Sequence, residues 1–138
     1  MRRLTLGLTG LLLVVGLAAQ EKPTYDPAEA IMGGALFKTY CASCHGKGGA
    51  GDGPLAESLK FGPSDLTQLA RKNKGRFPMD SVRGTIDGRR AVKAHGGSDM
   101  PVWGDAFKVS GEGYDEAKVA ERIKQLTHFL ASIQAADK

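Results

Sequence analysis

The sequence is poor in cysteine. Its two cysteines, Cys41 and Cys44, lie three positions apart in a chain of 138 residues. An exported scaffold held together by disulfides has more cysteines, spaced widely enough to join distant segments. A structural zinc site requires four ligands, and no second Cys/His pair has the spacing to complete one. The pair therefore predicts local chemistry rather than a covalent framework.

Long apolar runs are also scarce. The only one spans residues 4–17. It follows two arginines and ends in small residues, which is the order of a secretory signal peptide. It is shorter than the ~20 apolar residues of a membrane helix, and an uncleaved anchor is the alternative. We expect a signal peptide over 1–18, a short N-terminal extension over 19–25 and one domain over 26–138, in a periplasmic or otherwise exported protein. The pattern excludes a polytopic membrane protein.

The excess of positive charge is small. The chain carries 19 Lys and Arg against 15 Asp and Glu, and loss of the two arginines within residues 1–18 would leave 17 against 15, a net charge of +2. The basic residues are mostly interleaved with acidic ones. Nucleic-acid binding is therefore not expected.

No segment alternates apolar and polar residues in the manner of a β-strand, whereas both ends carry helix signals. Asp26 and Pro27 are typical of an N-cap and first helical position, and this helix is expected to reach about Tyr40. A second long helix is expected over 115–135. Its apolar residues recur every three or four positions: Val119, Ile123, Leu126, Leu130 and Ile133.

The middle of the chain predicts loops with short helices. Five glycines fall among the eight residues of 46–53, a density that excludes helix and strand there. Residues 95–101 are expected to form a further loop. Short helices are expected at 55–59, from Ser64 to the basic run at 71–76, and at 81–87 with Asp80 as the cap. The sequence thus predicts an all-α fold with helices at both ends.

The segment Cys41-Ala42-Ser43-Cys44-His45 carries the clearest chemistry. Two thiols three residues apart can form thioethers with the two vinyl groups on one side of a porphyrin, and the adjacent imidazole can reach the iron. A thioredoxin-like pair would need a sheet beside a helix N-terminus, which this sequence lacks. A plain local disulfide is the other alternative. The motif predicts one covalently attached haem c with His45 as an iron ligand.

A second ligand to the iron is expected from a loop. The candidates are Met32, Met79, Met100, His95 and His128. Met100 is chosen because it has no periodic apolar company and precedes Pro101, which keeps it extended. His95 is the rival, because two histidine ligands would lower the potential relative to His/Met. Met32 is assigned to packing on the first helix, and His128 to the rim of the last.

With these residues the sequence resembles class I cytochromes c, in their small bacterial exported form, over nearly all of 26–138. Gly33 and Phe37 stand before Cys41 as in the family's first helix, and Phe129-Leu130 resembles the aromatic–leucine pair of its last helix. The resemblance implies a cytochrome c-like fold. In that fold the N- and C-terminal helices cross and glycine-rich loops wrap one covalently bound haem.

The resemblance also implies roles for individual residues. Pro54 is similar to the family proline whose carbonyl receives the ring N–H of the haem histidine, with Pro63 as its rival. Residues 99–104 resemble the loop that carries the axial methionine. Trp103 in this loop is expected to pack near the haem edge.

A haem with both axial positions filled by protein leaves no open position for a substrate, so one-electron transfer is expected rather than catalysis. The protein is expected to be a monomer that serves as an exported carrier, or as the haem subunit of a respiratory dehydrogenase or oxidase. Its expected partners are redox proteins. Association with a membrane is expected only if residues 1–18 are retained. The basic run 71–76, with Arg89, Arg90 and Lys93, is either a solvated surface or a means of steering an acidic partner.

Two other functional classes stay open. A haem protein whose sixth ligand leaves would perform peroxidase chemistry or sense gases. An exported dithiol protein without haem would be colourless.

Overall fold

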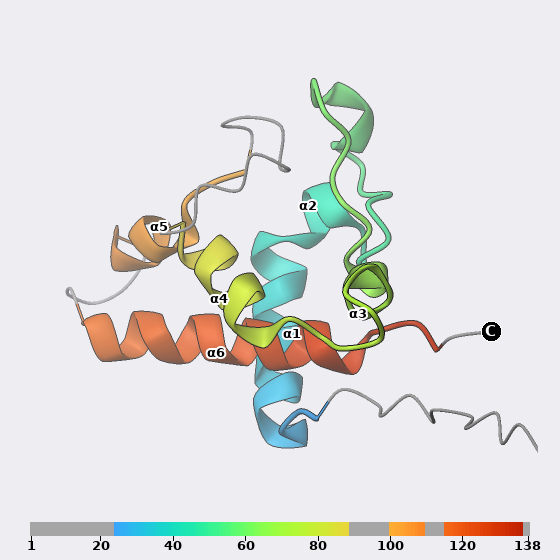
Figure 1. Cartoon of the computed structure of the whole chain (residues 1–138). Helices are drawn as coiled ribbons and strands as arrows, with labels where there is room; N and C mark the ends of the chain where they lie inside the picture. The colour runs from blue at the N-terminus through green and yellow to red at the C-terminus, as the bar shows by residue number, and fades with distance from the viewer. Residues whose placement is uncertain (1–23, 89–99, 110–114, 137–138) are drawn as a thin grey trace, which may run out of the picture.

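The computed structural model of the chain describes residues 24–88, 100–109 and 115–136, and these contain helices and no strand (Figure 1). The helices in chain order are α1 (Pro27–Tyr40), α2 (Ala42–His45), η1 (Ala56–Ser58), η2 (Leu66–Gln68), α3 (Leu69–Lys72), α4 (Met79–Asp87), α5 (Trp103–Val109) and α6 (Glu116–Ser132). The all-α prediction is confirmed. The expected signal peptide, and His95, lie outside the described residues. Within the described part, no helix combines the length and apolarity needed to cross a bilayer.

The first helix begins as its sequence predicts. The Asp26 carboxylate accepts hydrogen bonds from the backbone N–H groups of Ala28 and Glu29, at 2.8 and 3.3 Å. Pro27 follows as the first helical residue, where a missing N–H costs nothing. The helix then runs to Tyr40, directly before the first cysteine.

Helices α1 and α6 cross at Gly33 (Figure 1). A Cβ built on Gly33 would overlap the backbone carbonyl of Gln125 and lie 2.9 Å from the Cβ of Phe129. The rings of Phe37 and Phe129 meet one turn further on, with centroids 4.9 Å apart. The absence of a side chain at Gly33 therefore lets the two helices pack closely, and the crossing that the resemblance implied is confirmed.

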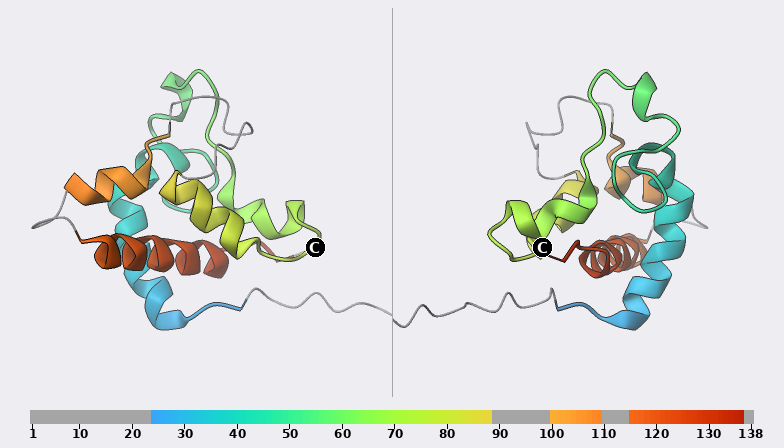
Figure 2. Two further views of the ribbon diagram at one scale, coloured as in Figure 1. Left: turned by 60° about the vertical axis from the view of Figure 1, so that its left-hand side comes forward. Right: turned by 90° about the vertical axis from the view of Figure 1, so that its right-hand side faces the viewer.

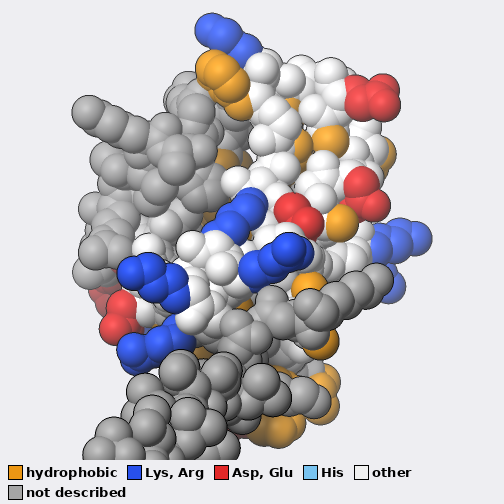
Figure 3. Space-filling view, turned by 45° about the vertical axis from the view of Figure 1, so that its right-hand side comes forward, with side chains coloured by type: hydrophobic (Ala, Val, Ile, Leu, Met, Phe, Trp, Pro, Cys, Tyr) orange, Lys and Arg blue, Asp and Glu red, His pale blue; other side chains and the backbone are white. Residues whose placement is uncertain are grey.

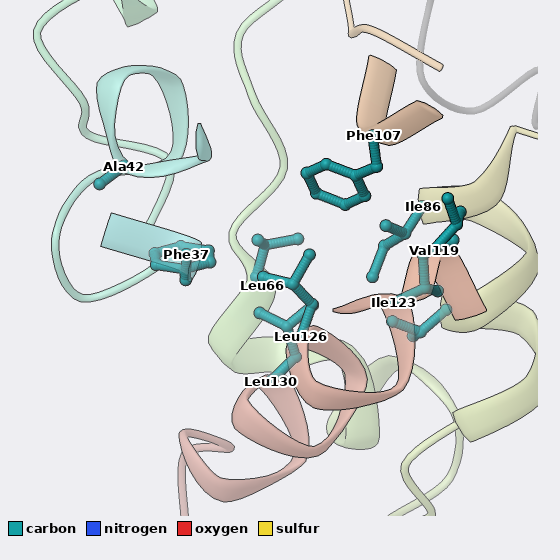
Figure 4. Close-up of a cluster of buried hydrophobic side chains, with 10 residues drawn as sticks. Phe37, Ala42, Leu66, Ile86, Phe107, Val119, Ile123, Leu126 and Leu130 are labelled. Carbon is teal, nitrogen blue, oxygen red and sulfur yellow. The ribbon is translucent and has the colours of Figure 1, made fainter. Parts of the chain in front are cut away.

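The hydrophobic core lies between α6 and the elements around it (Figure 4). The predicted stripe on α6 is buried at Val119, Ile123, Leu126 and Leu130. It meets buried side chains from α1, η2, α4 and α5: Phe37, Leu66, Val82, Ile86 and Phe107. Full burial of one such side chain stabilises the fold by roughly 1.5–3 kcal/mol. Since α6 contributes four of them and meets four other elements, it is the element against which the rest of the core packs.

Helix α4 begins earlier than predicted. It starts at Met79, with Pro78 as its N-cap, so that Asp80 lies inside the first turn instead of capping the helix. A carboxylate in the first turn still interacts favourably with the helix dipole. The helix ends at Asp87, as predicted, and its C-cap is Gly88, whose φ of 81° lies in the left-handed region that glycine adopts easily.

Three other expectations need correction. Helix α5 was not predicted, because the residue before it is Val102, which is not a capping residue type, and no other signal marks its start. Helix α6 ends at Ser132, three residues before Ala135. Met32 does not pack in the core, because its side chain is 57% exposed on the outer face of α1.

The long connection from residue 46 to residue 65 lies on one side of the crossing of α1 and α6, at the end of α1 that leads into the cysteine segment. Figures 1 and 2 show this connection opposite the end of α1 that carries Asp26. Helices α4 and α5 lie on the same side of α6 as this connection. The arrangement places the cysteine segment, the connection and residues 100–103 around one region.

Candidate cofactor site

The cysteine segment follows α1 directly, with Cys41 as the only residue between α1 and α2. Cys41 is the C-cap of α1, donating its N–H to the Phe37 carbonyl at 2.9 Å, and it is also the N-cap of α2. The His45 N–H donates to the Cys41 carbonyl at 2.9 Å, so these two residues lie one helical turn apart. Gly46 then ends α2 with a φ of 77°. This local geometry presents Cys41 and His45 to one cavity.

Two adjoining cavities, of about 150 and 430 Å³, occupy the region between α2, α4 and α5. They share four lining residues, which are Cys41, His45, Met100 and Trp103. The inner cavity is walled mainly by aliphatic side chains: Leu66, Leu69, Val82, Ile86, Leu126 and Leu130. The outer cavity adds Cys44 and the connection from Leu55 to Ser64. The predicted thiols and iron ligands therefore come together at one largely apolar space.

His45 is buried, at 7% exposure, and its ring Nδ1 lies 3.1 Å from the carbonyl oxygen of Ser64. A carbonyl can only accept a hydrogen bond, so this contact favours the tautomer with the proton on Nδ1. Nε2 is then the basic nitrogen, which is the form in which imidazole binds a metal. The ring is thus oriented by the backbone that passes beside it.

The structure corrects the predicted partner of this histidine. The carbonyl at Nδ1 belongs to Ser64 and not to Pro54, which is exposed. The turn at Pro54 is held beside α2, because Gly53 N–H donates to the Cys44 carbonyl at 3.1 Å and Leu55 N–H to the Ser43 carbonyl at 2.9 Å. The chain comes back past the imidazole ten residues later. Pro63, directly before Ser64, is the sequence signal that could have identified the partner.

The surroundings of Cys41 do not favour a redox role. Cys41 and Cys44 are not joined by a disulfide. Burial and, to a smaller extent, the neighbouring Cys44 raise the pKa of the Cys41 thiol to about 12. A thioredoxin-like pair requires a lowered thiol pKa, so this environment disfavours thiol–disulfide exchange.

Met100 alone among the described candidates for the second iron ligand lines the cavities with His45. It is half-buried and precedes Pro101 outside any helix. Met79 lies in a separate surface groove beside Lys74. His128 accepts a hydrogen bond from the Asp26 N–H at 3.0 Å, near the start of α1.

Trp103, the first residue of α5, forms one wall of both cavities. Its ring centroid lies 5.6 Å from that of Tyr40 and 5.5 Å from that of Phe107. Tyr40 also contacts Phe107, at 5.2 Å, so the three rings form one cluster. This cluster connects the end of α1 to α5, and Tyr40 is a lining residue that the sequence did not single out as part of the site.

The chemistry of the site fits a haem. The aliphatic walls suit a porphyrin, and an imidazole with a thioether is a donor set that haem iron accepts. Cys41 and Cys44 line the same space as these donors. In the described part of the chain, no cluster of three or more His, Cys, Asp and Glu residues could hold a bare metal ion.

Comparison with known proteins identifies one family. The family model for "Cytochrome C oxidase, cbb3-type, subunit III" matches residues 28–119, two-thirds of the chain. The matched span includes both cysteines, His45 and Met100. Neither a curated protein nor a solved structure gives a significant match.

Proposed function

Since this chain belongs to the family of cytochrome c domains described as subunit III of cbb3-type cytochrome c oxidase, we propose that it transfers single electrons by one His/Met-ligated haem c. The observation that carries the proposal is the meeting of Cys41, His45 and Met100 at one apolar space. When bound, the haem supplies a one-electron ferrous/ferric couple.

Each residue has a separate task in this proposal. Cys41 and Cys44 hold the group covalently, so that it stays with the carrier in both oxidation states. His45 gives Nε2 to the iron while the Ser64 carbonyl holds its Nδ1–H, which keeps the imidazole basic and oriented. Met100 would supply its thioether sulfur as the second ligand, and such a ligand favours the less charged ferrous state.

The aliphatic wall has an electrostatic effect. Leu66, Val82 and Leu126 are buried and give the inner cavity an apolar wall. A medium of low dielectric penalises the additional charge of the ferric state, so burial raises the potential in the same direction as Met100 does. Because His45 and Met100 would leave the iron no position for a substrate, we propose a carrier rather than an enzyme.

The partners in this proposal are redox proteins with an acidic docking face. Arg71, Lys72, Lys74 and Arg76 are exposed and, within the described residues, none of them takes part in an ion pair. Figure 3 shows Lys and Arg side chains spread over the face of the molecule that is turned forward there. Such cations steer an acidic partner during diffusion. Export through a signal peptide over 1–18, and work in the periplasm as a free carrier or oxidase subunit, belong to the same proposal.

The deciding experiment is expression in a host that matures c-type cytochromes. We expect a coloured product that keeps its haem after denaturation and shows a six-coordinate low-spin spectrum in both oxidation states. The variant Cys41→Ser/Cys44→Ser, made in the same host, should lose covalent haem. A colourless wild-type product would support the dithiol alternative. Ready binding of carbon monoxide by the ferrous protein at neutral pH would support a labile sixth ligand.

A further inference from the structure

The residues that follow α6 fold back against the segment 66–70. The Ala135 N–H donates to the Thr67 carbonyl at 2.9 Å. The Gln134 side chain reaches both ends of the same segment: its Nε2 donates to the Leu66 carbonyl at 2.8 Å, and its Oε1 accepts from the Ala70 N–H at 2.8 Å. Gln134 thus satisfies two backbone groups that lie four residues apart.

Gln134 is itself held in place. Its Nε2 also donates to the Leu130 carbonyl at 2.6 Å, in the last turn of α6. The side chain is half-buried, so water does not replace these bonds freely. One amide therefore connects the end of α6 to both ends of the segment 66–70.

The other side of this segment contacts the cysteine motif and its loop. The Leu66 N–H donates to the Gly49 carbonyl at 2.7 Å, while the Leu66 carbonyl receives the Gln134 amide. Two residues earlier, the Ser64 carbonyl lies at the Nδ1 of His45. Leu66 is therefore bonded through both of its backbone groups, once to the loop that follows His45 and once to Gln134.

Side-chain packing reinforces this connection. A Cβ built on Gly49 would lie 2.8 Å from Cδ1 of Ile133 and 3.7 Å from Cβ of Leu66. Gly49 in the loop is therefore packed against Ile133, the residue just before Gln134, and also lies beside Leu66 of the segment. The last residues of the chain, the segment 66–70 and the motif loop form one packed unit.

We propose that Gln134 is a positioning residue for His45: its amide fixes the segment 66–70, and this holds the Ser64 carbonyl on the ring Nδ1. The inference rests on the proposed role of His45 as an iron ligand. A hydrogen bond at Nδ1 makes the imidazole a stronger donor and sets the plane of its ring. A stronger donor stabilises the ferric state. Loss of Gln134 should therefore raise the potential of the holoprotein.

The test compares Gln134→Met, which keeps the length of the side chain and removes its amide, with Ser132→Ala. Ser132 is the matched control, because its hydroxyl donates to the Phe129 carbonyl at 2.7 Å, a hydrogen bond that stays within the same helix end. In the ferric holoprotein, NMR measures solvent exchange of the His45 Nδ1 proton. Loss of the amide should speed this exchange roughly tenfold in Gln134→Met, and the potential should rise. Ser132→Ala should change neither.

A second variant, Gln134→Glu, removes only one part of the amide's hydrogen bonding. It keeps an acceptor for the Ala70 N–H and loses the donor to the Leu66 carbonyl, so it should also speed exchange and raise the potential. Unchanged exchange and potential in both Gln134 variants would overturn the inference alone. A wild-type holoprotein in which His45 does not bind the iron would overturn the proposed function and this inference with it.

Discussion

The ring Nδ1 of His45 lies 3.1 Å from the carbonyl oxygen of Ser64, although nineteen residues separate the two in the sequence. The contact joins the residue that ends the cysteine motif to a connection that closes one side of the outer cavity. Because the carbonyl is part of a backbone bonded at Leu66 on both sides, the imidazole is oriented by the fold rather than by its own rotamer preference. A preorganised ligand needs little rearrangement when the iron changes charge.

Met100→Ala tests the sixth ligand. Removal of the thioether should convert the six-coordinate low-spin spectrum into a high-spin or ligand-exchanged one, and the potential should fall because the ferrous state loses a favourable ligand. Absorption spectra and redox titration of the holoprotein measure both. Met32→Ala, on the exposed outer face of α1, should leave spectrum and potential as in the wild type. If Met100→Ala changes neither while His95→Ala changes both, the ligand is His95.

Gly33→Ala tests the crossing of α1 and α6. The added Cβ would meet the backbone carbonyl of Gln125, which a side-chain rotation cannot relieve. The two helices must then separate, at a cost of about 1–3 kcal/mol in the free energy of unfolding. Denaturant unfolding of the holoprotein, followed by circular dichroism, measures the loss.

Gly48→Ala is the control for that substitution, because a Cβ there meets nothing within 4 Å. It should be neutral or stabilise the protein by up to ~1 kcal/mol, through a less flexible unfolded chain. Equal effects of the two substitutions would show that the close approach at Gly33 contributes nothing to stability.

Folding of the chain should depend on the cofactor. Without haem, the aliphatic wall that includes Leu66, Val82 and Leu126 faces an open cavity, and α4 loses the contacts that a bound porphyrin would give it. The variant Cys41→Ser/Cys44→Ser should therefore show much less helix by far-UV circular dichroism than the mature holoprotein. A helical content equal to that of the holoprotein would mean that the chain assembles its core unaided.

The elements that the sequence predicted well are those whose signals are local. Asp26 and Pro27 mark the start of α1 because capping involves residues within one turn, and the motif ending in His45 needs only adjacent positions. The crossing of the terminal helices was implied by the resemblance, and Gly33 and Phe37, which carry part of that resemblance, lie one turn apart on one helix. Each of these inferences uses residues that are near one another in the chain.

The features that the sequence did not reveal depend on distant partners. The Ser64 carbonyl is a backbone group, and every residue has one, so no residue type marks it. Helix α6 stops at Ser132 because Gln134 bonds to Ala70 and Leu66, which lie 64 and 68 residues away in the sequence. The apolar period on its own favoured a longer helix. Only the fold brings these groups together.

The exposed cations of the run 71–76 should control association with an acidic redox partner. Reversing two of them in Arg71→Glu/Lys72→Glu should lower the association rate roughly tenfold at low ionic strength and flatten its salt dependence, because steering acts during diffusion. Stopped-flow electron transfer with an acidic partner protein, measured over a range of salt concentrations, tests this. The control reverses Lys118, an exposed residue in the first turn of α6, which lies across the molecule from α3 (Figure 1). If only the net charge of the protein mattered, each reversed charge would lower the association rate by the same factor on both surfaces. An equal effect per reversed charge would therefore show that the run 71–76 is simply a solvated surface.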